Sequence, residues 1–207
     1  MLCPVKSGVV KVYYEPKDHE LDIHVLESAA YRRLRERGLC ECGIIPRFFG
    51  MMEKFNPQPC QSYLEMFLHD EYLPSAIFLE YIPNLEMIHL HNYTQKRMEN
   101  FLKGIQGIHG AGVLHSDPKP RNMMVVKDDS ERVVWIDFDR AETYNIPVTD
   151  EQKRLLDEEE EEIFLSFRDF LVSTLHQTRI HSKSHHLLQQ ADCAKGELDE
   201  AYLFYCT

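Results

Sequence analysis

The sequence predicts an α+β fold, because its 207 residues contain both strand-like and helix-like segments. Three observations carry this prediction. Residues Gly8–Tyr14 are mostly β-branched or aromatic, which is typical of a strand. Residues His19–Arg37 have apolar side chains at helical spacing, and two short apolar runs flank a polar turn at Asp128–Ser130. With 43% hydrophobic residues, the chain can bury a core of ordinary size.

The first predicted elements are a strand over Gly8–Tyr14 and a helix over His19–Arg37. Lys11 would project from the strand, and Gly38 would end the helix because glycine accepts the backbone conformation found there. One helical stripe contains Leu26, Ala30 and Leu34, and the neighbouring stripe contains Glu27, Tyr31 and Arg35.

Two further strands and a second helix are expected in the middle of the chain. The strands cover the apolar runs Ile44–Lys54 and Ala76–Ile82. Asn92–Gln95 has the form of a capping box, and the following apolar residues at helical spacing predict a helix that Gly104 and Gly107 weaken. These apolar residues are Met98, Phe101, Leu102, Ile105 and Ile108.

A β-hairpin and a third helix are expected next. The hairpin pairs Met123–Val126 with Val133–Ile136. The pattern Thr149–Gln152 indicates a second capping box, followed by an apolar helical stripe. That stripe contains Ile163, Phe164, Phe167, Phe170, Leu171 and Leu175. The acidic run Asp157–Glu162 is interpreted as the solvated face of the same helix.

Composition narrows the classes of function. The chain has 23 Lys and Arg against 34 Asp and Glu, and the formal charge of −11 disfavours nucleic acid and anionic membranes as partners. Its 6 cysteines show no paired framework, and the histidines beyond residue 176 lack a regular metal-binding spacing. No signal peptide and no apolar run of about 18 residues occur. We expect an intracellular protein, cytoplasmic or nuclear.

The residues with chemical potential lie from His115 to Asn122 and just after the hairpin, at Asp137. The first segment reads His115-Ser-Asp-Pro-Lys-Pro-Arg-Asn122, and the second reads Trp135-Ile-Asp-Phe-Asp139. Taken singly, Asp117 and Asn122 are ordinary turn residues and Asp137 is an ordinary strand end. Taken together, with a hairpin between them, they favour a functional interpretation.

This arrangement resembles the protein-kinase catalytic loop H-R-D-x-x-x-x-N followed by D-F-G. The resemblance implies that Asp117 accepts or orients the proton of a substrate hydroxyl and that Asn122 and Asp137 bind Mg²⁺. It also implies that Lys119 places a positive charge against the transferred phosphoryl group. His115 is expected to support the loop from below. Phosphoryl transfer requires a base, cations and oxygen ligands for those cations, and this segment supplies all three kinds of group.

The same resemblance extends upstream. Lys11 on its strand and Glu27 on its helix, sixteen residues later, resemble the kinase lysine that binds the α- and β-phosphates and its ion-pair partner. Leu79–Ile82 resembles the hinge between kinase lobes. There the carbonyl of Glu80 and the N–H of Ile82 would meet the adenine edge.

Several kinase features are missing from the sequence. No G-x-G-x-x-G loop precedes Lys11, and no A-P-E motif follows Asp137. The string Ile136–Asp139 is more similar to choline kinases and aminoglycoside phosphotransferases. We therefore expect a protein-kinase-like bilobal fold, with a truncated N-terminal lobe over residues 1–82 and a reduced helical C-terminal lobe over residues 83–207.

The expected function is an ATP- and Mg²⁺-dependent phosphotransferase. Its partners would be the nucleotide and a hydroxyl-bearing acceptor, either a small molecule or a protein. One alternative is a pseudokinase, a nucleotide-binding or scaffolding module without turnover. Another is a structural fragment that does not fold alone, since an incomplete small lobe exposes a sheet edge.

Overall fold

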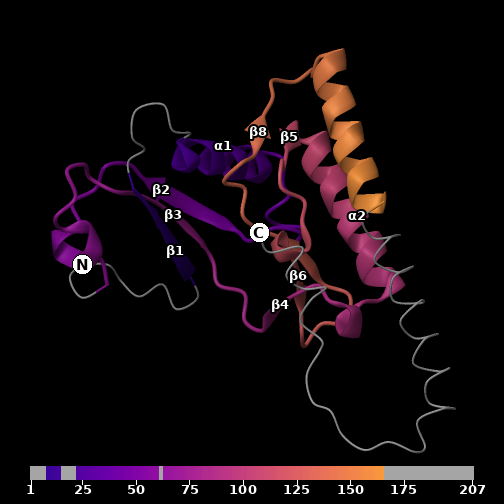
Figure 1. Ribbon diagram of the computed structural model, residues 1–207, viewed down its shortest axis with the longest axis horizontal. Coiled ribbons are helices and arrows are strands. Elements are labelled where there is room, and N and C mark those ends of the chain that lie inside the picture. Colours follow the sequence, from indigo (N-terminus) through magenta and orange to yellow (C-terminus); the bar gives the residue numbers. More distant parts are fainter. Residues whose placement is uncertain (1–7, 15–21, 61–62, 166–207) are drawn as a thin grey trace, which may run out of the picture. The chain divides into compact units, whose positions relative to one another are not determined.

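The computed structural model describes residues 8–14, 22–60 and 63–165 (Figure 1). They lie within a unit that ends at Ser166. Helices are mixed with antiparallel strands, which confirms the α+β class and is consistent with a reduced kinase-like fold. The predicted apolar stripe beyond Phe164 and the histidine-rich segment lie outside the described residues.

The first sheet has three antiparallel strands in the order β1-β3-β2. These are β1 (Gly8–Tyr13), β2 (Phe48–Met52) and β3 (Ser75–Glu80). Lys11 pairs with Ile77 across the β1–β3 ladder. Because side chains alternate between the two faces of a strand, Lys11 and Tyr13 lie on the same face of β1.

Helix α1 (Ile23–Glu36) lies beside this sheet (Figure 1). The carboxylate of Asp22 caps it by accepting from the N–H of Val25 at 3.1 Å. The helix stops just before Gly38, whose φ of 77° is the left-handed conformation expected at a helix end. Its buried residues are His24, Glu27, Ser28, Ala30, Tyr31 and Leu34.

The predicted hairpin is confirmed as part of a second antiparallel sheet with the order β4-β6-β7. The strands are β4 (Leu85–Met87), β6 (Met123–Val126) and β7 (Val133–Trp135). A two-stranded sheet pairs β5 (Val113–Leu114) with β8 (Glu142–Thr143). Four short 3₁₀ helices are η1 (Gln58–Cys60), η2 (Glu65–Phe67), η3 (Leu90–Asn92) and η4 (Pro120–Asn122).

Helix α2 (Gln95–Gly110) packs closely against β7. A Cβ atom placed on Gly104 would lie 2.9 Å from Ile44 Cγ2 and 3.1 Å from Trp135 Cδ1, so the glycine permits this approach. The residue that caps this helix lies two positions after the predicted cap, Asn92. Thr94 caps it instead, accepting from the N–H of Arg97 at 3.1 Å.

A further helix covers residues 150–165 and lies along α2 (Figure 1). Its predicted capping box is confirmed. The N–H of Thr149 donates to Gln152 Oε1 at 3.0 Å, and the N–H of Gln152 donates to Thr149 Oγ1 at 3.2 Å. Of the predicted apolar stripe, Ile163 is buried, whereas Phe164 is 58% exposed.

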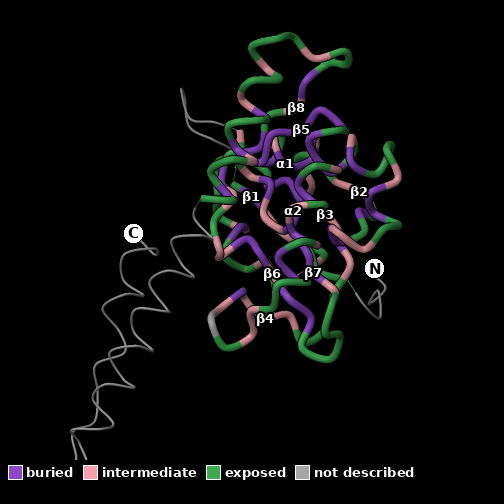
Figure 2. The backbone as a smooth tube through the Cα atoms, turned by 90° about the vertical axis from the view of Figure 1, so that its right-hand side faces the viewer, coloured by how far each residue is buried: buried purple, intermediate pink, exposed green. Residues whose placement is uncertain are grey.

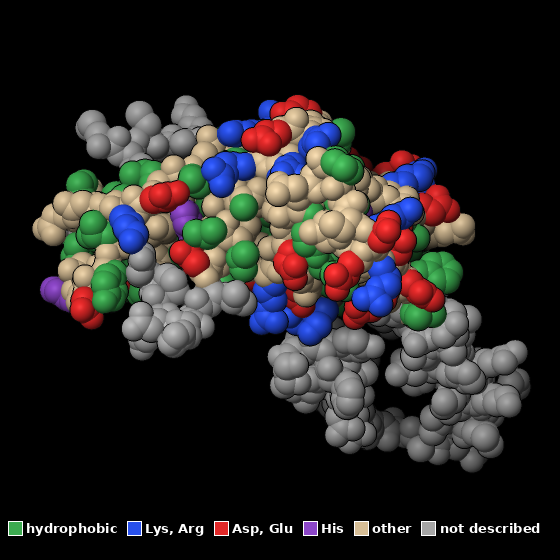
Figure 3. All heavy atoms as spheres, turned by 90° about the horizontal axis from the view of Figure 1, so that it is seen from above, with side chains coloured by type: hydrophobic (Ala, Val, Ile, Leu, Met, Phe, Trp, Pro, Cys, Tyr) green, Lys and Arg blue, Asp and Glu red, His purple; other side chains and the backbone are tan. Residues whose placement is uncertain are grey.

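Two strands are shorter than predicted. Strand β2 uses only the middle of the Ile44–Lys54 run, and β3 ends at Glu80 instead of Ile82. Buried residues, drawn in purple in Figure 2, are concentrated in β3, β5, β6 and β7 and in the helices. On the face drawn in Figure 3, acidic and basic side chains are interspersed. In the part of the chain that the structure describes, no helix is apolar and long enough to span a membrane.

Candidate active site

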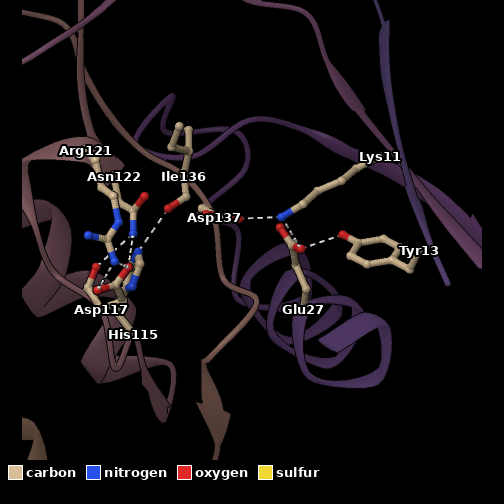
Figure 4. Close-up of polar contacts among 9 residues, drawn as sticks. All are labelled: Lys11, Tyr13, Glu27, His115, Asp117, Arg121, Asn122, Ile136 and Asp137. Carbon is tan, nitrogen blue, oxygen red and sulfur yellow. Dashed lines mark hydrogen bonds and ion pairs between the residues drawn. The ribbon is translucent and has the colours of Figure 1, made fainter. Parts of the chain in front are cut away.

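Lys11 connects two parts of the candidate site (Figure 4). Its Nζ donates to Glu27 Oε2 at 2.7 Å and forms an ion pair with Asp137 Oδ1. Glu27 is 16 residues from Lys11 in sequence, and Asp137 is 126 residues away. The fold therefore brings a strand, a helix and the loop after β7 to one ammonium group.

The carboxylate of Glu27 is 1% exposed. Burial raises its pKa above the usual value, while Lys11 and a hydrogen bond from the Tyr13 hydroxyl oppose that rise. Burial alone would lower the pKa of Lys11, but its two carboxylate partners outweigh burial and raise it. Lys11 thus carries a positive charge at neutral pH.

Asp117 is 5% exposed and accepts hydrogen bonds from two neighbours on the same loop. Arg121 Nη2 donates to Asp117 Oδ1 at 2.9 Å and to Oδ2 at 2.8 Å. Asn122 Nδ2 donates to Asp117 Oδ2 at 2.7 Å and to the Asp117 carbonyl at 2.9 Å. Lys119 Nζ lies 3.9 Å from Asp117 Oδ1. The predicted base is therefore oriented from several directions and surrounded by positive charge.

Backbone contacts connect this loop to Asp137. The N–H of Ile136 donates to the carbonyl of Asn122 at 3.1 Å, and His115 Nε2 lies 3.1 Å from the Ile136 carbonyl (Figure 4). His115 is fully buried and its ring centroid is 4.6 Å from that of Phe138. Burial lowers its pKa, which favours a neutral ring. Its predicted place beneath the loop is confirmed.

Two residues of the site have left-handed backbone conformations. Ser116 has φ of 63°, and Asp137 has φ of 65°. Such conformations cost energy in residues other than glycine and persist where the surrounding structure holds them. Here the N–H of Ser116 donates to Glu159 Oε1 at 2.6 Å, and the N–H of Ile136, which precedes Asp137, donates to the Asn122 carbonyl.

Aromatic rings connect the first sheet to the loop that begins at His115. Tyr31 stacks on Phe48 of β2 with ring centroids 5.8 Å apart and meets Phe138 edge-on at 5.2 Å. Phe138 in turn contacts the ring of His115. These four rings form a continuous packed column, so β2, α1 and both loops of the site cannot shift independently.

Glu159 is the exception to the prediction that Asp157–Glu162 is a solvated face, which is confirmed for the exposed residues Asp157, Glu158, Glu161 and Glu162. It is 6% exposed, and its oxygens accept from the backbone N–H of His115 at 3.0 Å and of Ser116 at 2.6 Å. His109 Nε2 lies 2.7 Å from Glu159 Oε2, and His109 Nδ1 lies 3.0 Å from Glu160 Oε1. The helix of residues 150–165 therefore holds the start of the loop His115–Asn122.

The predicted adenine contacts, Glu80 and Ile82, contact residues outside these two groups. The Glu80 carboxylate accepts from the N–H of Arg47 at 3.2 Å, and Ile82 is buried beside Val126 and Val134. No hydrogen bond or ion pair among the described residues connects either of them to Lys11 or Asp117. The structure thus brings Lys11, Glu27 and Asp137 together, and separately Asp117, Lys119 and Asn122.

Sequence reasoning missed three residues of this site, Tyr13, Arg121 and Glu159. Tyr13 could have been found from its spacing, because it is two residues after Lys11 on a strand and so shares its face. Arg121 lies four residues after Asp117, within the segment already selected. For Glu159 the sequence gives no such signal, because its partners lie 43 and 44 residues away.

The available oxygen atoms fit Mg²⁺. Asn122 directs its Nδ2 toward Asp117, and its Oδ1 receives no hydrogen bond from a described residue (Figure 4). Asp137 supplies a carboxylate. No group of three or more His, Cys, Asp or Glu suited to a metal occurs in residues 8–14, 22–60 and 63–165. Mg²⁺ commonly binds one or two protein oxygens and completes its shell with phosphates and water, which matches this donor set.

Comparison with known proteins gives a partial similarity to a protein kinase. The chain is 32% identical over 114 residues to mitogen-activated protein kinase p38a of Drosophila melanogaster. The match covers 54% of this chain and 30% of that kinase, so the chain spans less than a third of that relative's length. No protein-family model matches. The similarity indicates a kinase-like relationship.

Proposed function

We propose that this chain is an ATP- and Mg²⁺-dependent phosphotransferase that acts on a hydroxyl acceptor. The observation that carries the proposal is the convergence of Lys11 and Glu27 with Asp137, which is 126 residues after Lys11 and lies in the loop after β7. That loop is hydrogen-bonded to the loop of Asp117 through the Ile136 N–H and the Asn122 carbonyl. A surface ion pair with a purely structural role does not require a neighbouring base and amide. A phosphoryl-transfer site uses a base and oxygen ligands for Mg²⁺, and Asp117, Asn122 and Asp137 are of these types.

Each residue has a role in the proposed reaction. Lys11 binds the α- and β-phosphates, with Glu27 as its fixed counter-charge, and Asn122 and Asp137 hold Mg²⁺. When bound, Mg²⁺ neutralises phosphate charge. The acceptor oxygen forms a new bond to the γ-phosphorus as the bond to the β-phosphate oxygen breaks. Asp117 takes the hydroxyl proton, Lys119 lies against the transferred group, and ADP leaves.

Adenine binding would use the main chain after β3. We propose that the Glu80 carbonyl and the Ile82 N–H meet the adenine edge. In support, the Ile82 N–H has no acceptor among the described residues. This places the boundary between the proposed lobes, residues 1–82 and 83–207, at the nucleotide.

The test combines binding with turnover. We expect ATP with Mg²⁺ to raise the melting temperature, because a ligand that binds only the folded state stabilises it by mass action. Asp117→Ala should keep that shift and lose at least about 100-fold in ATP turnover. Asp70→Ala, at an exposed position, is the matched control. Equal turnover by wild type and Asp117→Ala would overturn the enzyme assignment, and no thermal shift at millimolar nucleotide would overturn nucleotide binding as well.

A second candidate is a pseudokinase that binds nucleotide without turnover. The two hydrogen bonds from Arg121 to Asp117 favour it, because they occupy both oxygens of the proposed base. In that case ATP would raise the melting temperature of the wild type, but neither the wild type nor Arg121→Ala would turn over ATP. Turnover that rises in Arg121→Ala would support an enzyme whose base Arg121 restrains.

A further inference from the structure

Tyr13 is a buried phenol directed at Glu27. It is 3% exposed, its hydroxyl donates to Glu27 Oε2, and its ring meets that of His24 edge-on with centroids 5.4 Å apart (Figure 4). Burial, followed by the nearby Glu27 carboxylate, raises its pKa, so the hydroxyl remains a donor at neutral pH. The ring has little freedom to turn the hydroxyl elsewhere.

One oxygen of Glu27 therefore accepts from two donors on the same strand. Lys11 and Tyr13 both reach Oε2 from β1, and no other donor to that carboxylate occurs among the described residues. A buried carboxylate is stable only while it is hydrogen-bonded. If Lys11 turned toward another anion, Tyr13 would be the remaining described donor.

Lys11 has such a second anion at hand in Asp137. Lys11 is thus shared between Glu27, which positions it, and Asp137, which the proposed function assigns to Mg²⁺. Any change that weakens the hold of Glu27 on Lys11 moves the ammonium toward Asp137. There it would compete with the metal and leave the phosphate position.

We propose that Tyr13 is a positioning residue that fixes the Glu27 carboxylate toward Lys11 and so keeps Lys11 available to phosphates and Asp137 available to Mg²⁺. This inference rests on the proposed function. Tyr13 itself touches neither the nucleotide nor the reacting atoms. Its effect passes through Glu27 to Lys11.

The variant Tyr13→Phe removes the hydroxyl and keeps the ring that packs on His24. We expect its affinity for ATP with Mg²⁺ to fall about tenfold, as expected for the loss of a hydrogen bond to a charged group. Affinity for adenosine, which has no phosphates, should not change, whereas a purely structural role would weaken both. In a Glu27→Gln background, adding Tyr13→Phe should have no further effect, because the two changes act on one contact. Tyr63→Phe, at an 88% exposed position, is the control.

Equal ATP affinity of wild type and Tyr13→Phe would overturn the inference and leave the proposed function intact. If the wild type binds no ATP, the proposed function fails. Chemical labelling of lysines in the ligand-free protein then tests whether Tyr13 positions Glu27. With an amine-acylating ester, the labelling of Lys11 should differ between Tyr13→Phe and wild type, because the ammonium moves from Glu27 toward Asp137 in the variant. The exposed Lys103 provides the internal reference. An unchanged ratio of Lys11 to Lys103 labelling would show that Tyr13 does not position Glu27.

Discussion

Arg121 donates from a single nitrogen to both carboxylate oxygens of Asp117, at 2.9 and 2.8 Å. The guanidinium lies four residues after the carboxylate and is 38% exposed, so solvent weakens the pair. The Asp117 carboxylate, by contrast, is largely shielded from water. The loop therefore depends on Arg121 to balance a buried charge.

Arg121→Met should lower the free energy of unfolding by about 1 kcal/mol, because Asn122 still donates to the carboxylate after the guanidinium is gone. Urea denaturation measures this change. Lys119→Met is the matched control, since Lys119 is 50% exposed and 3.9 Å from Asp117, and it should change stability by less than about 0.5 kcal/mol. A larger loss in Lys119→Met than in Arg121→Met would contradict this account.

Glu159→Gln should destabilise the protein by about 2–3 kcal/mol. The carboxylate faces two backbone N–H groups and His109, and a glutamine would turn an NH₂ group toward one of these donors. Glu158→Gln changes a neighbour that is 59% exposed and should lie within about 0.5 kcal/mol of wild type. Comparable stability of the two variants in chemical denaturation would exclude Glu159 as the anchor of the loop.

Removing the hydroxyl from two buried tyrosines near Glu27 should change the free energy of unfolding in opposite directions. Tyr13→Phe removes a hydrogen bond to a carboxylate and should lower the free energy of unfolding by about 1.5–3 kcal/mol. The hydroxyl of Tyr31 is buried without a hydrogen-bond partner among the described residues, so Tyr31→Phe should raise that energy by about 1 kcal/mol. Thermal or urea unfolding of both variants provides the comparison, and a greater loss in Tyr31→Phe would reverse the assignment.

His115 should make stability depend on pH. Burial lowers its folded pKa below the usual 6.5, so the unfolded chain binds the proton more readily. Its contribution is present above pH 6.5 and is lost as the pH falls through the folded pKa. His115→Phe keeps a ring between Phe138 and Trp135 but cannot ionise. The fall in unfolding free energy from pH 7 to 5 should therefore be smaller in this variant, and an equal fall would rule His115 out as the cause.

Gly104→Ala and Gly110→Ala test the close approach of α2 to β7. At Gly104 a Cβ would be 2.9 Å from Ile44 Cγ2, so overpacking should cost about 1–3 kcal/mol and exceed the gain in helix propensity. A Cβ added at Gly110 would have no atom of a packing neighbour within 4 Å, so alanine should stabilise the helix by up to about 1 kcal/mol. Stabilisation by Gly104→Ala would show that the helix can move away from the sheet.

Local patterns in the sequence predicted local structure well. The reciprocal bonds of Thr149 and Gln152 involve groups three residues apart, and the Met123–Val126 hairpin closes through a short turn. Strand ends were predicted less well. Ile82 is apolar, but its side chain packs in a cluster beside Val126 and Val134, and the residue does not extend the strand. Apolar character alone does not separate these two causes.

The site was predictable only in part. The types of residue at Lys11, Asp117 and Asp137 pointed to phosphate chemistry, and the structure brings Lys11 to Asp137 as a direct ion pair. Glu159 could not be identified because five further acidic residues surround it in the run Asp157–Glu162. Glu159 differs from these neighbours because it accepts hydrogen bonds from the backbone N–H groups of His115 and Ser116, which are far away in sequence. Only tertiary packing brings these groups together.

The contact between Glu159 and the His115 N–H can form only after residue 159 has been synthesised. The His115 N–H acquires its carboxylate acceptor from a residue 44 positions downstream. At typical rates of translation, about 2–9 s separate the two on the ribosome. By the end of that interval the nascent chain contains every residue of the loop His115–Asn122, but the start of the loop lacks its anchor. A ribosome stalled before codon 159 would therefore carry the complete loop sequence without the carboxylate that holds the N–H groups of His115 and Ser116.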